Sequence, residues 1–435
     1  MVFTGVAIRG GGSPLLDSRS RIRTLRAVLL RPTSFFFRGP ILRVVVACFF
    51  AMGAAAAENV FTDLRARAAN KDPQAVSELG KRYFTGDGMD RDFIEAARWF
   101  RVAAENGDIE AQVNLATMLA EGRGIPRDYA EAMRLFKAAA DSGDPLAQVG
   151  VGMLYGQGLG VPKNLAEAAR WFSYAAENGD ARAQANLGVM LIEGTGVAQN
   201  IPEGIRWLTQ AAERGNSEAQ VNLAVAHLNG NGMPKNLVEA HRLLNASAQQ
   251  TNVVALRQLG ILYANGGGVE KDLSRARSYF ERAAKRLDAQ ACYNLGVLCR
   301  DGLGGPTSLT RSVQLFRTAA DSGMATAQYN LGSQYGRGQG VPQDFVEAHR
   351  WVLKAAQNGY AQAQTSVGLM YHQGVGVPRD DREAYKWLKI ASQVDPKTTA
   401  PLLTKVGASL TEKQTQEAEQ AAKAFAAPDG PAPRP

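Results

Sequence analysis

A pair of glycines recurs through most of the chain at a fixed interval of 36 residues. When an alanine is taken as position 0 of each unit, glycine occupies positions +11 and +13 of nine consecutive units without a gap. A chain of 435 residues would otherwise suggest about three ordinary domains. The nine units, residues 75–398, instead predict a repeat architecture in which each unit packs on its neighbours. The position-0 alanines are Ala75, Ala111, Ala147, Ala183, Ala219, Ala255, Ala291, Ala327 and Ala363.

The third unit shows why the first half of each unit should form a helix, called helix A. Val151, Leu154 and Tyr155 are spaced as on one face of a helix. Gly158 follows at +11, and glycine is the residue that most readily takes the left-handed conformation at a helix C-terminus. Pro162 then prevents the helix from continuing. Helix A is therefore expected to end near +11 in every unit.

The second half of each unit predicts another helix, helix B, starting at about +18. Glutamate at +20 in seven units predicts a capping box, and glycine at +32 ends the helix in six. Small residues at +21 allow two helices to approach, and we expect the indole rings at +24, from Trp99 to Trp387, to fill the gap between them. The fold predicted is all-α, a solenoid of stacked antiparallel hairpins. Residues that cap helix N-termini occupy +17 in all units: Asp92, Asp128, Asn164, Asn200, Asn236, Asp272, Ser308, Asp344 and Asp380.

The segments outside the repeats have other roles. Residues 58–74 predict an N-terminal capping helix, residues 399–427 a C-terminal capping helix, and residues 428–435 a proline-rich tail without regular structure. Residues 1–57 contain eight arginines and one acid, and they end in an apolar run from Val44 to Ala57. This pattern predicts a signal peptide, and hence a periplasmic or secreted protein. Two alternatives stay open: a membrane anchor formed by residues 44–57, and a cytoplasmic protein whose translation starts further downstream.

The formal charge of +8 comes almost entirely from the leader. The remaining chain is nearly neutral with interspersed signs, so we expect no nucleic-acid partner. No later stretch approaches the roughly 20 apolar residues of a membrane-spanning helix. The mature chain is therefore expected to be soluble, with at most peripheral association with envelope complexes.

The repeat pattern resembles a known family. Ala-Gln-x-x-Leu-Gly-x-x-Tyr-x-x-Gly-x-Gly-Val-Pro-x-Asp, followed by Glu-Ala-x-x-Trp and Ala-Ala-x-x-Gly, is similar to the Sel1-like repeat family, relatives of tetratricopeptide repeats; residues 327–362 match almost throughout. The resemblance implies a right-handed α/α solenoid that acts as an adaptor or scaffold, often exported in bacteria. A cysteine-rich branch, to which β-lactam binding has been attributed, has disulfide-stapled hairpins. This chain departs from that branch, because Ala283 and Ala284 stand where a bridging cysteine would be expected.

No catalytic or metal-binding pattern is found. The four histidines, His227, His241, His349 and His372, lack cysteines or carboxylates at ligand spacing, so we expect no metal and no cofactor. Cys292 and Cys299 lie about 10 Å apart on one helix, too far for a disulfide, and are expected to be buried thiols. The glycines 266–268 lack the lysine and serine of a phosphate-binding loop. We therefore expect a protein that is not an enzyme.

The tetratricopeptide resemblance implies that positions +2, +6, +9 and +10 of helix A line a concave groove that binds a protein or peptide. For the valines in this set, packing against the neighbouring helix is an equal alternative. The predicted function is an exported scaffold that assembles or regulates an envelope complex; the alternatives are a cell-wall or β-lactam-interacting protein and a cytosolic adaptor. The predicted groove residues are Val221, Val225, Arg257, Ile261, Tyr293, Val297, Arg300, Tyr329, Arg337 and His372.

Overall fold

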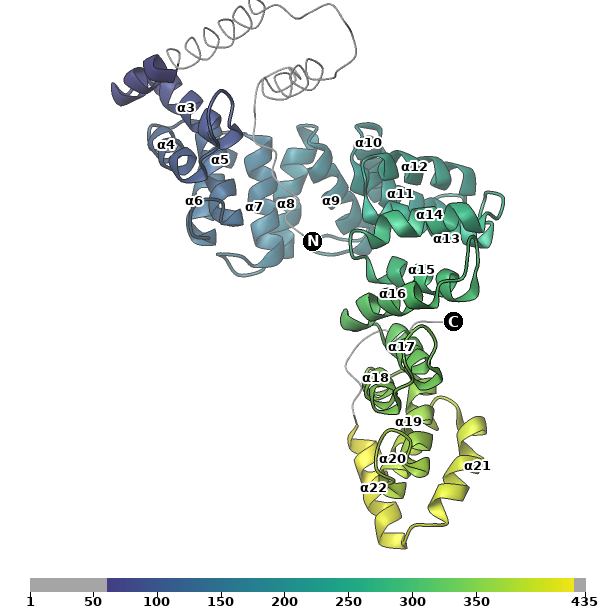
Figure 1. Ribbon diagram of the computed structural model, residues 1–435. Coiled ribbons are helices and arrows are strands. Elements are labelled where there is room, and N and C mark those ends of the chain that lie inside the picture. The colour runs from purple at the N-terminus through teal and green to yellow at the C-terminus, as the bar shows by residue number, and fades with distance from the viewer. Residues whose placement is uncertain (1–60, 426–435) are drawn as a thin grey trace, which may run out of the picture. The chain divides into compact units, whose positions relative to one another are not determined.

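The computed structural model describes residues 61–425, and every regular element in this range is a helix (Figure 1). The predicted leader, residues 1–57, and the tail, residues 428–435, lie outside the described residues. Within residues 61–425, none of the helices combines the length and the apolar character that crossing a membrane requires. The prediction of an all-α repeat fold is confirmed.

Nine A helices alternate with nine B helices in the described part of the chain. The A helices are α3 (Pro73–Thr85), α5 (Ile109–Glu121), α7 (Pro145–Gln157), α9 (Ala181–Glu193), α11 (Ser217–Asn229), α13 (Val253–Asn265), α15 (Ala289–Asp301), α17 (Ala325–Arg337) and α19 (Ala361–Gln373). The B helices are α4 (Phe93–Glu105), α6 (Tyr129–Asp141), α8 (Leu165–Glu177), α10 (Ile201–Glu213), α12 (Leu237–Gln249), α14 (Leu273–Ala284), α16 (Leu309–Asp321), α18 (Phe345–Gln357) and α20 (Asp381–Ala391). Two further helices follow, α21 (Pro396–Gly407) and α22 (Glu412–Ala424).

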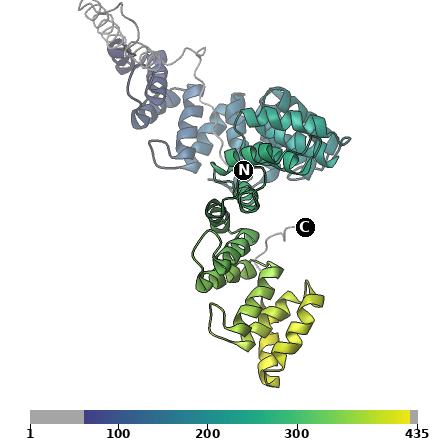
Figure 2. The same cartoon turned by 45° about the vertical axis from the view of Figure 1, so that its right-hand side comes forward.

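The helices form two compact units, whose boundary falls inside α11 between Ala219 and Gln220. In the first unit, helices α3 to α10 pack mainly on their neighbours in sequence, and Phe100, Phe136 and Phe172 are fully buried between them. In the second unit, α12 to α20 continue the same succession, with α21 and α22 packed on α20. Figure 2 shows the alternation of A and B helices within each unit from a second direction.

The two repeated glycines have different structural roles. Gly158 at +11 caps α7 with a φ of 72°, and its N–H group donates to the carbonyl oxygen of Leu154. Gly160 at +13 also has a positive φ of 71°, but a Cβ atom there would lie 2.5 Å from the carbonyl carbon of Tyr129 in the preceding repeat. The second glycine therefore allows the loop of one repeat to contact the first turn of helix B of the repeat before it.

The gap between helices A and B is filled from position +25, so the expectation that the indole rings at +24 fill it was wrong. Phe172 is 1% exposed, and its ring lies against Gly152, where a Cβ atom would be 2.8 Å from the ring. Position +24 is one residue, or about 100°, further back around helix B. Trp351 there packs into a cluster with Val313 and Phe316 of the preceding repeat. Three other repeats have the same contact between a phenylalanine at +25 and the glycine at +5. The pairs are Phe100 with Gly80, Phe280 with Gly260, and Phe316 with Gly296.

The predicted N-caps are present, but the predicted capping boxes of the repeats are not what stabilises these helix starts. Asn164 accepts a hydrogen bond from the N–H group of Glu167, as expected. The N–H group of Asn164 itself donates to the carbonyl oxygen of Tyr155 at 2.9 Å, so it does not need the carboxylate that a capping box supplies. Glu167 pairs with Arg170 instead. Ser308, also predicted as an N-cap, makes no side-chain capping bond.

Short helices cover both ends of the described chain. Residues 61–69 are helical and bury Leu64 and Ala68. At the C-terminal end the structure has two helices instead of one. Helix α21 begins at Pro396, before the expected boundary, and its Val406 packs with Ala384 and Leu388 of α20. Helix α22 starts with a capping box formed by Thr411 and Gln414, and its buried alanines face α20.

Candidate functional site

All the residues predicted for the groove lie on A helices of the second unit, from α11 to α19. We call positions +2, +6, +9 and +10 of these helices the A-helix face. Helices α13, α15, α17 and α19 all end at a glycine at +11, so one position per repeat recurs on the same side of successive hairpins. The predicted residues divide into apolar, arginine, tyrosine and histidine groups, which the structure places in different environments.

The apolar members of the A-helix face contribute mainly to packing. Val221 is only 6% exposed, which leaves little of its side chain for a partner. Val225, Ile261 and Val297 are half-buried. Val297 packs against the cluster around Phe316. These side chains therefore form a partly apolar floor between the polar residues of the same face.

Two of the three arginines are held by hydrogen bonds that reach the next A helix or its N-cap. The Nη1 atom of Arg257 lies 2.7 Å from Oδ2 of Asp288, the residue that caps α15. Arg300 donates from Nη1 to Asn330 on α17 at 2.8 Å, and it binds Asp301 through two nitrogens at 2.7 and 2.9 Å. The hydrogen bonds that Arg300 donates to Asp301 raise the pKa of Arg300. Both guanidinium groups are therefore fixed in position and electrically compensated.

The third arginine, Arg337, is different. It is exposed in the last turn of α17 and makes no ion pair with any described residue. Its charge is therefore available to a ligand on the A-helix face.

A third tyrosine, Tyr360, lies beside the two tyrosines of this face, and the sequence had not indicated it. Tyr293 is half-buried, with its ring 5.8 Å from that of Phe316. The ring of Tyr329 meets Tyr360 edge-on at 5.3 Å. Burial raises the pKa of Tyr360, and the neighbouring Tyr293 and Tyr329 raise it further. Tyr360 stands at the N-cap of α19, where most repeats have Asp or Asn, and that departure was the available signal.

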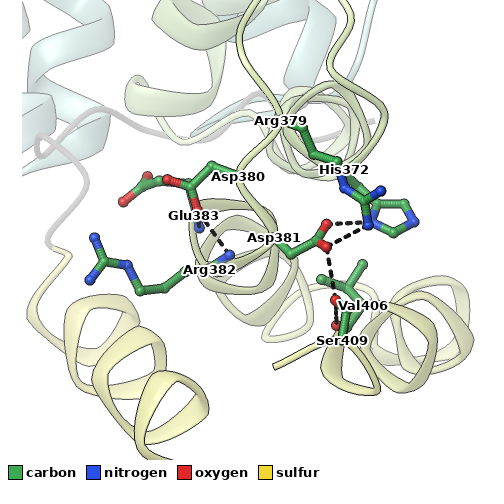
Figure 3. A network of polar contacts seen from close by, with 8 residues as sticks. All are labelled: His372, Arg379, Asp380, Asp381, Arg382, Glu383, Val406 and Ser409. Atoms are coloured by element: carbon green, nitrogen blue, oxygen red, sulfur yellow. Dashed lines mark hydrogen bonds and ion pairs between the residues drawn. The ribbon is translucent and has the colours of Figure 1, made fainter. Parts of the chain in front are cut away.

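The predicted groove residue His372 takes part in a polar network at the end of the second unit (Figure 3). Its Nδ1 atom lies 2.6 Å from Oδ1 of Asp381, at the start of α20. Asp381 also accepts hydrogen bonds from Arg379 at 2.7 Å and from Ser409 at 2.8 Å. Burial alone would raise the pKa of Asp381, but these hydrogen bonds outweigh burial and lower the pKa to about 2. The network connects α19, α20 and the turn after α21.

The same network does not have the geometry of a hydrolase. Ser409 donates its proton to Asp381 and to the carbonyl oxygen of Val406, so it is not activated by His372. Cys292 and Cys299 are buried free thiols, as predicted, and burial raises the pKa of each. Among residues 61–425 no three His, Cys, Asp or Glu side chains are grouped so that they could hold a metal ion. The polar groups of the A-helix face can donate and accept hydrogen bonds and present one free charge, which suits binding.

Comparisons with known proteins agree with the repeat pattern. The Sel1 repeat model matches nine consecutive segments: residues 73–108, 109–144, 145–180, 181–216, 217–252, 253–286, 289–324, 325–360 and 361–394. Among curated proteins, no relative matches the sequence.

Solved structures give the same family. A Sel1 repeat protein from Oxalobacter formigenes is 31% identical with a TM-score of 0.54, over 71% of this chain and 90% of that one. A protein described as c5321, a protective antigen of uropathogenic Escherichia coli with an SLR fold, is 29% identical with a TM-score of 0.47, over 83% and 85% of the two chains. The repeat match covers most of the sequence, so this chain belongs to the Sel1 repeat family.

Proposed function

We propose that the chain is an exported, non-enzymatic scaffold that holds a partner protein on the A-helix face and thereby assembles or regulates an envelope complex. The Sel1 repeats form a helical scaffold of a kind typical of protein–protein interaction. Support for export comes from the leader, with its arginine-rich start and its apolar run before Glu58. Support for the binding face comes from the side chains of the seventh and eighth repeats.

The observation that carries the binding proposal is the arrangement of Tyr293, Tyr329 and Arg337. Tyrosine and arginine are the residue types that dominate binding energy at protein interfaces. The two tyrosine rings are held by aromatic neighbours, so they lose little conformational entropy when a partner binds. Arg337 adds an exposed positive charge without a partner among the described residues. Together they provide ordered apolar area and one free charge.

Site-specific photo-cross-linking in cells tests this face directly. A photoreactive amino acid replaces Ser333, which lies at +6 of α17 between Tyr329 and Arg337 in sequence. The matched control places it at Gln314, which is exposed on α16. We expect a cross-linked protein from position 333 that is absent from position 314 and is lost when Arg337 is replaced by glutamate. Equal products from both positions would contradict binding at the A-helix face.

The localisation has its own test. Alkaline phosphatase, which is active only after export, is fused to the C-terminus of two forms of the chain. One form carries the leader, and the other lacks residues 1–57. We expect activity only with the leader, and a mature N-terminus at Glu58. An inactive fusion would favour the cytosolic adaptor, and an uncleaved active fusion would favour the membrane anchor.

A further inference from the structure

Helix α14 differs from the other B helices in its charge. Residues 270–286 contain six basic and three acidic side chains. The corresponding residues of the eighth repeat, 342–358, contain two of each. Arg275 replaces the glutamate that seven repeats have at +20, so a positive charge stands at the N-terminal end of a helix, where the helix dipole favours a negative one. Arg275 is compensated there by Asp272, the N-cap of α14, at 3.2 Å.

The charge at the C-terminal end of α14 has less compensation from the surrounding described residues. Glu281 is shared between Arg277, at 3.8 Å, and Arg311, at 3.1 Å. Arg282 donates to the carbonyl oxygen of Ala248 and pairs with no carboxylate in the described structure. Lys285 and Arg286, which follow the helix, are exposed and form no ion pair with residues 61–425. The C-terminal end of α14 therefore presents several cations to solvent.

An exposed leucine stands next to these cations in a strained conformation. Leu287 is 74% exposed and has a φ of 59°, in the left-handed region that bulky side chains avoid. Six other repeats have glycine at this position, +32, where the conformation costs nothing. The Sel1 repeat match is interrupted here, ending at residue 286 and resuming at 289. Lys71 and Thr251, at the equivalent place before α3 and α13, also have positive φ values, of 61° and 62°, but Leu287 is the apolar side chain among the three.

We propose that Arg282, Lys285, Arg286 and Leu287 form a second docking surface, which binds an acidic polypeptide segment that carries an apolar side chain. The three cations attract the carboxylates, and Leu287 gives the apolar contact. A polyphosphate chain suits the surface less well, because it has no apolar group to contact the exposed Leu287. A lipid surface suits it less well too, because one leucine is a small apolar area for insertion. This surface lies on a B helix and is independent of the A-helix face.

The test uses fluorescence anisotropy with the full chain and a fluorescein-labelled peptide of glutamate and leucine. We expect Lys285→Glu with Arg286→Glu to weaken binding about tenfold or more, because two attractions become repulsions. The matched control, Arg350→Glu with Lys354→Glu, makes the same change of charge on α18 and should leave the affinity unchanged. Leu287→Gly should weaken binding by about threefold or more while thermal stability is kept or raised.

Several results would overturn the proposal. One is no binding of the peptide by the wild-type chain, and another is equal loss in the α14 and α18 double variants. Normal binding by Leu287→Gly would remove the leucine from the surface and contradict the proposal as stated. Binding of anionic phosphatidylglycerol vesicles or polyphosphate in place of the peptide, lost in the α14 variant, would assign the surface to a different anionic ligand.

Discussion

Asp381→Asn tests whether the network in Figure 3 holds the C-terminal cap on the last repeat. The three side chains that donate to this carboxylate lower its pKa from 3.8 to about 2. At about 1.36 kcal/mol per pH unit, this difference corresponds to about 2.4 kcal/mol of stabilisation by the ionised form. Screening by solvent around Arg379 reduces this figure, so we expect the variant to lose about 1 to 2 kcal/mol. Asparagine keeps the size of the side chain but removes its charge.

The effect should be local and should depend on pH in a defined direction. Helix α21 contacts the network through Ser409, so its amide hydrogens should exchange faster in Asp381→Asn at pH 7. The folded pKa is lowered, so the stabilisation is fully present above pH about 4 and is lost as the pH falls through 2. The difference between wild type and variant, measured by urea unfolding, should shrink to about half near pH 3.

A control separates the network from a general loss of negative charge. Asp321→Asn removes an exposed carboxylate at the end of α16, which forms no ion pair in the described part of the chain. This change should leave the exchange of α21 unaltered. Unchanged exchange of α21 in Asp381→Asn at pH 7, or a difference that stays constant down to pH 3, would refute the reasoning.

Three further predictions concern the repeats. Gly160→Ala should destabilise the chain by about 3 kcal/mol, because a Cβ atom there meets the backbone of the preceding repeat. Gly143→Ala should cost only about 1 kcal/mol, because its positive φ disfavours alanine but nothing lies within 4 Å of the added Cβ atom. Urea unfolding of the two variants measures the difference. Leu287→Gly should raise stability by about 0.5 to 1 kcal/mol, since glycine relieves the positive φ, and a lower melting temperature would contradict this. Cys292 and Cys299 should react with a thiol reagent only as fast as the chain unfolds, because both side chains are buried and burial also raises the pKa of each; rapid modification of either of these two thiols in the folded chain would contradict this.

The repeat period and the helix ends could be predicted from the sequence because they depend on local chemistry. Gly158 requires a positive φ, and Asn164 caps a helix through a residue three positions away. The capping box failed for a tertiary reason, since the N–H group of Asn164 is taken by the carbonyl oxygen of Tyr155 on the other helix. The indole assignment failed because positions +24 and +25 are both apolar, and only the packed hairpin shows that the glycine of helix A faces +25.

The sequence could predict which side chains lie on the A-helix face, but not which of them already have hydrogen-bond or ion-pair partners. The sequence placed Arg300 and Arg337 on one side of the repeats, yet only the structure shows that Arg300 is bound by Asp301 and Asn330 while Arg337 is not. The contact between Asp381 and Ser409 spans 28 residues and depends on how α21 packs, so no local pattern could indicate it.

One signal in the sequence was missed. The near-neutral charge outside the leader is the sum of two unlike parts. Residues 61–219 contain 17 basic and 22 acidic side chains, and residues 220–425 contain 23 basic and 16 acidic ones. Counting by compact unit would have shown the excess of basic residues to which α14 contributes.

The most direct test of the central claim is quantitative affinity capture from an envelope extract with three forms of the chain. These are the wild type, the triple variant Tyr293→Ala, Tyr329→Ala and Arg337→Ala, and the α18 variant Arg350→Glu with Lys354→Glu, each shown to be folded by circular dichroism. We expect a protein that is retained by the wild type and the α18 variant and lost by the folded triple variant. Equal retention by all three forms would contradict partner binding at the A-helix face.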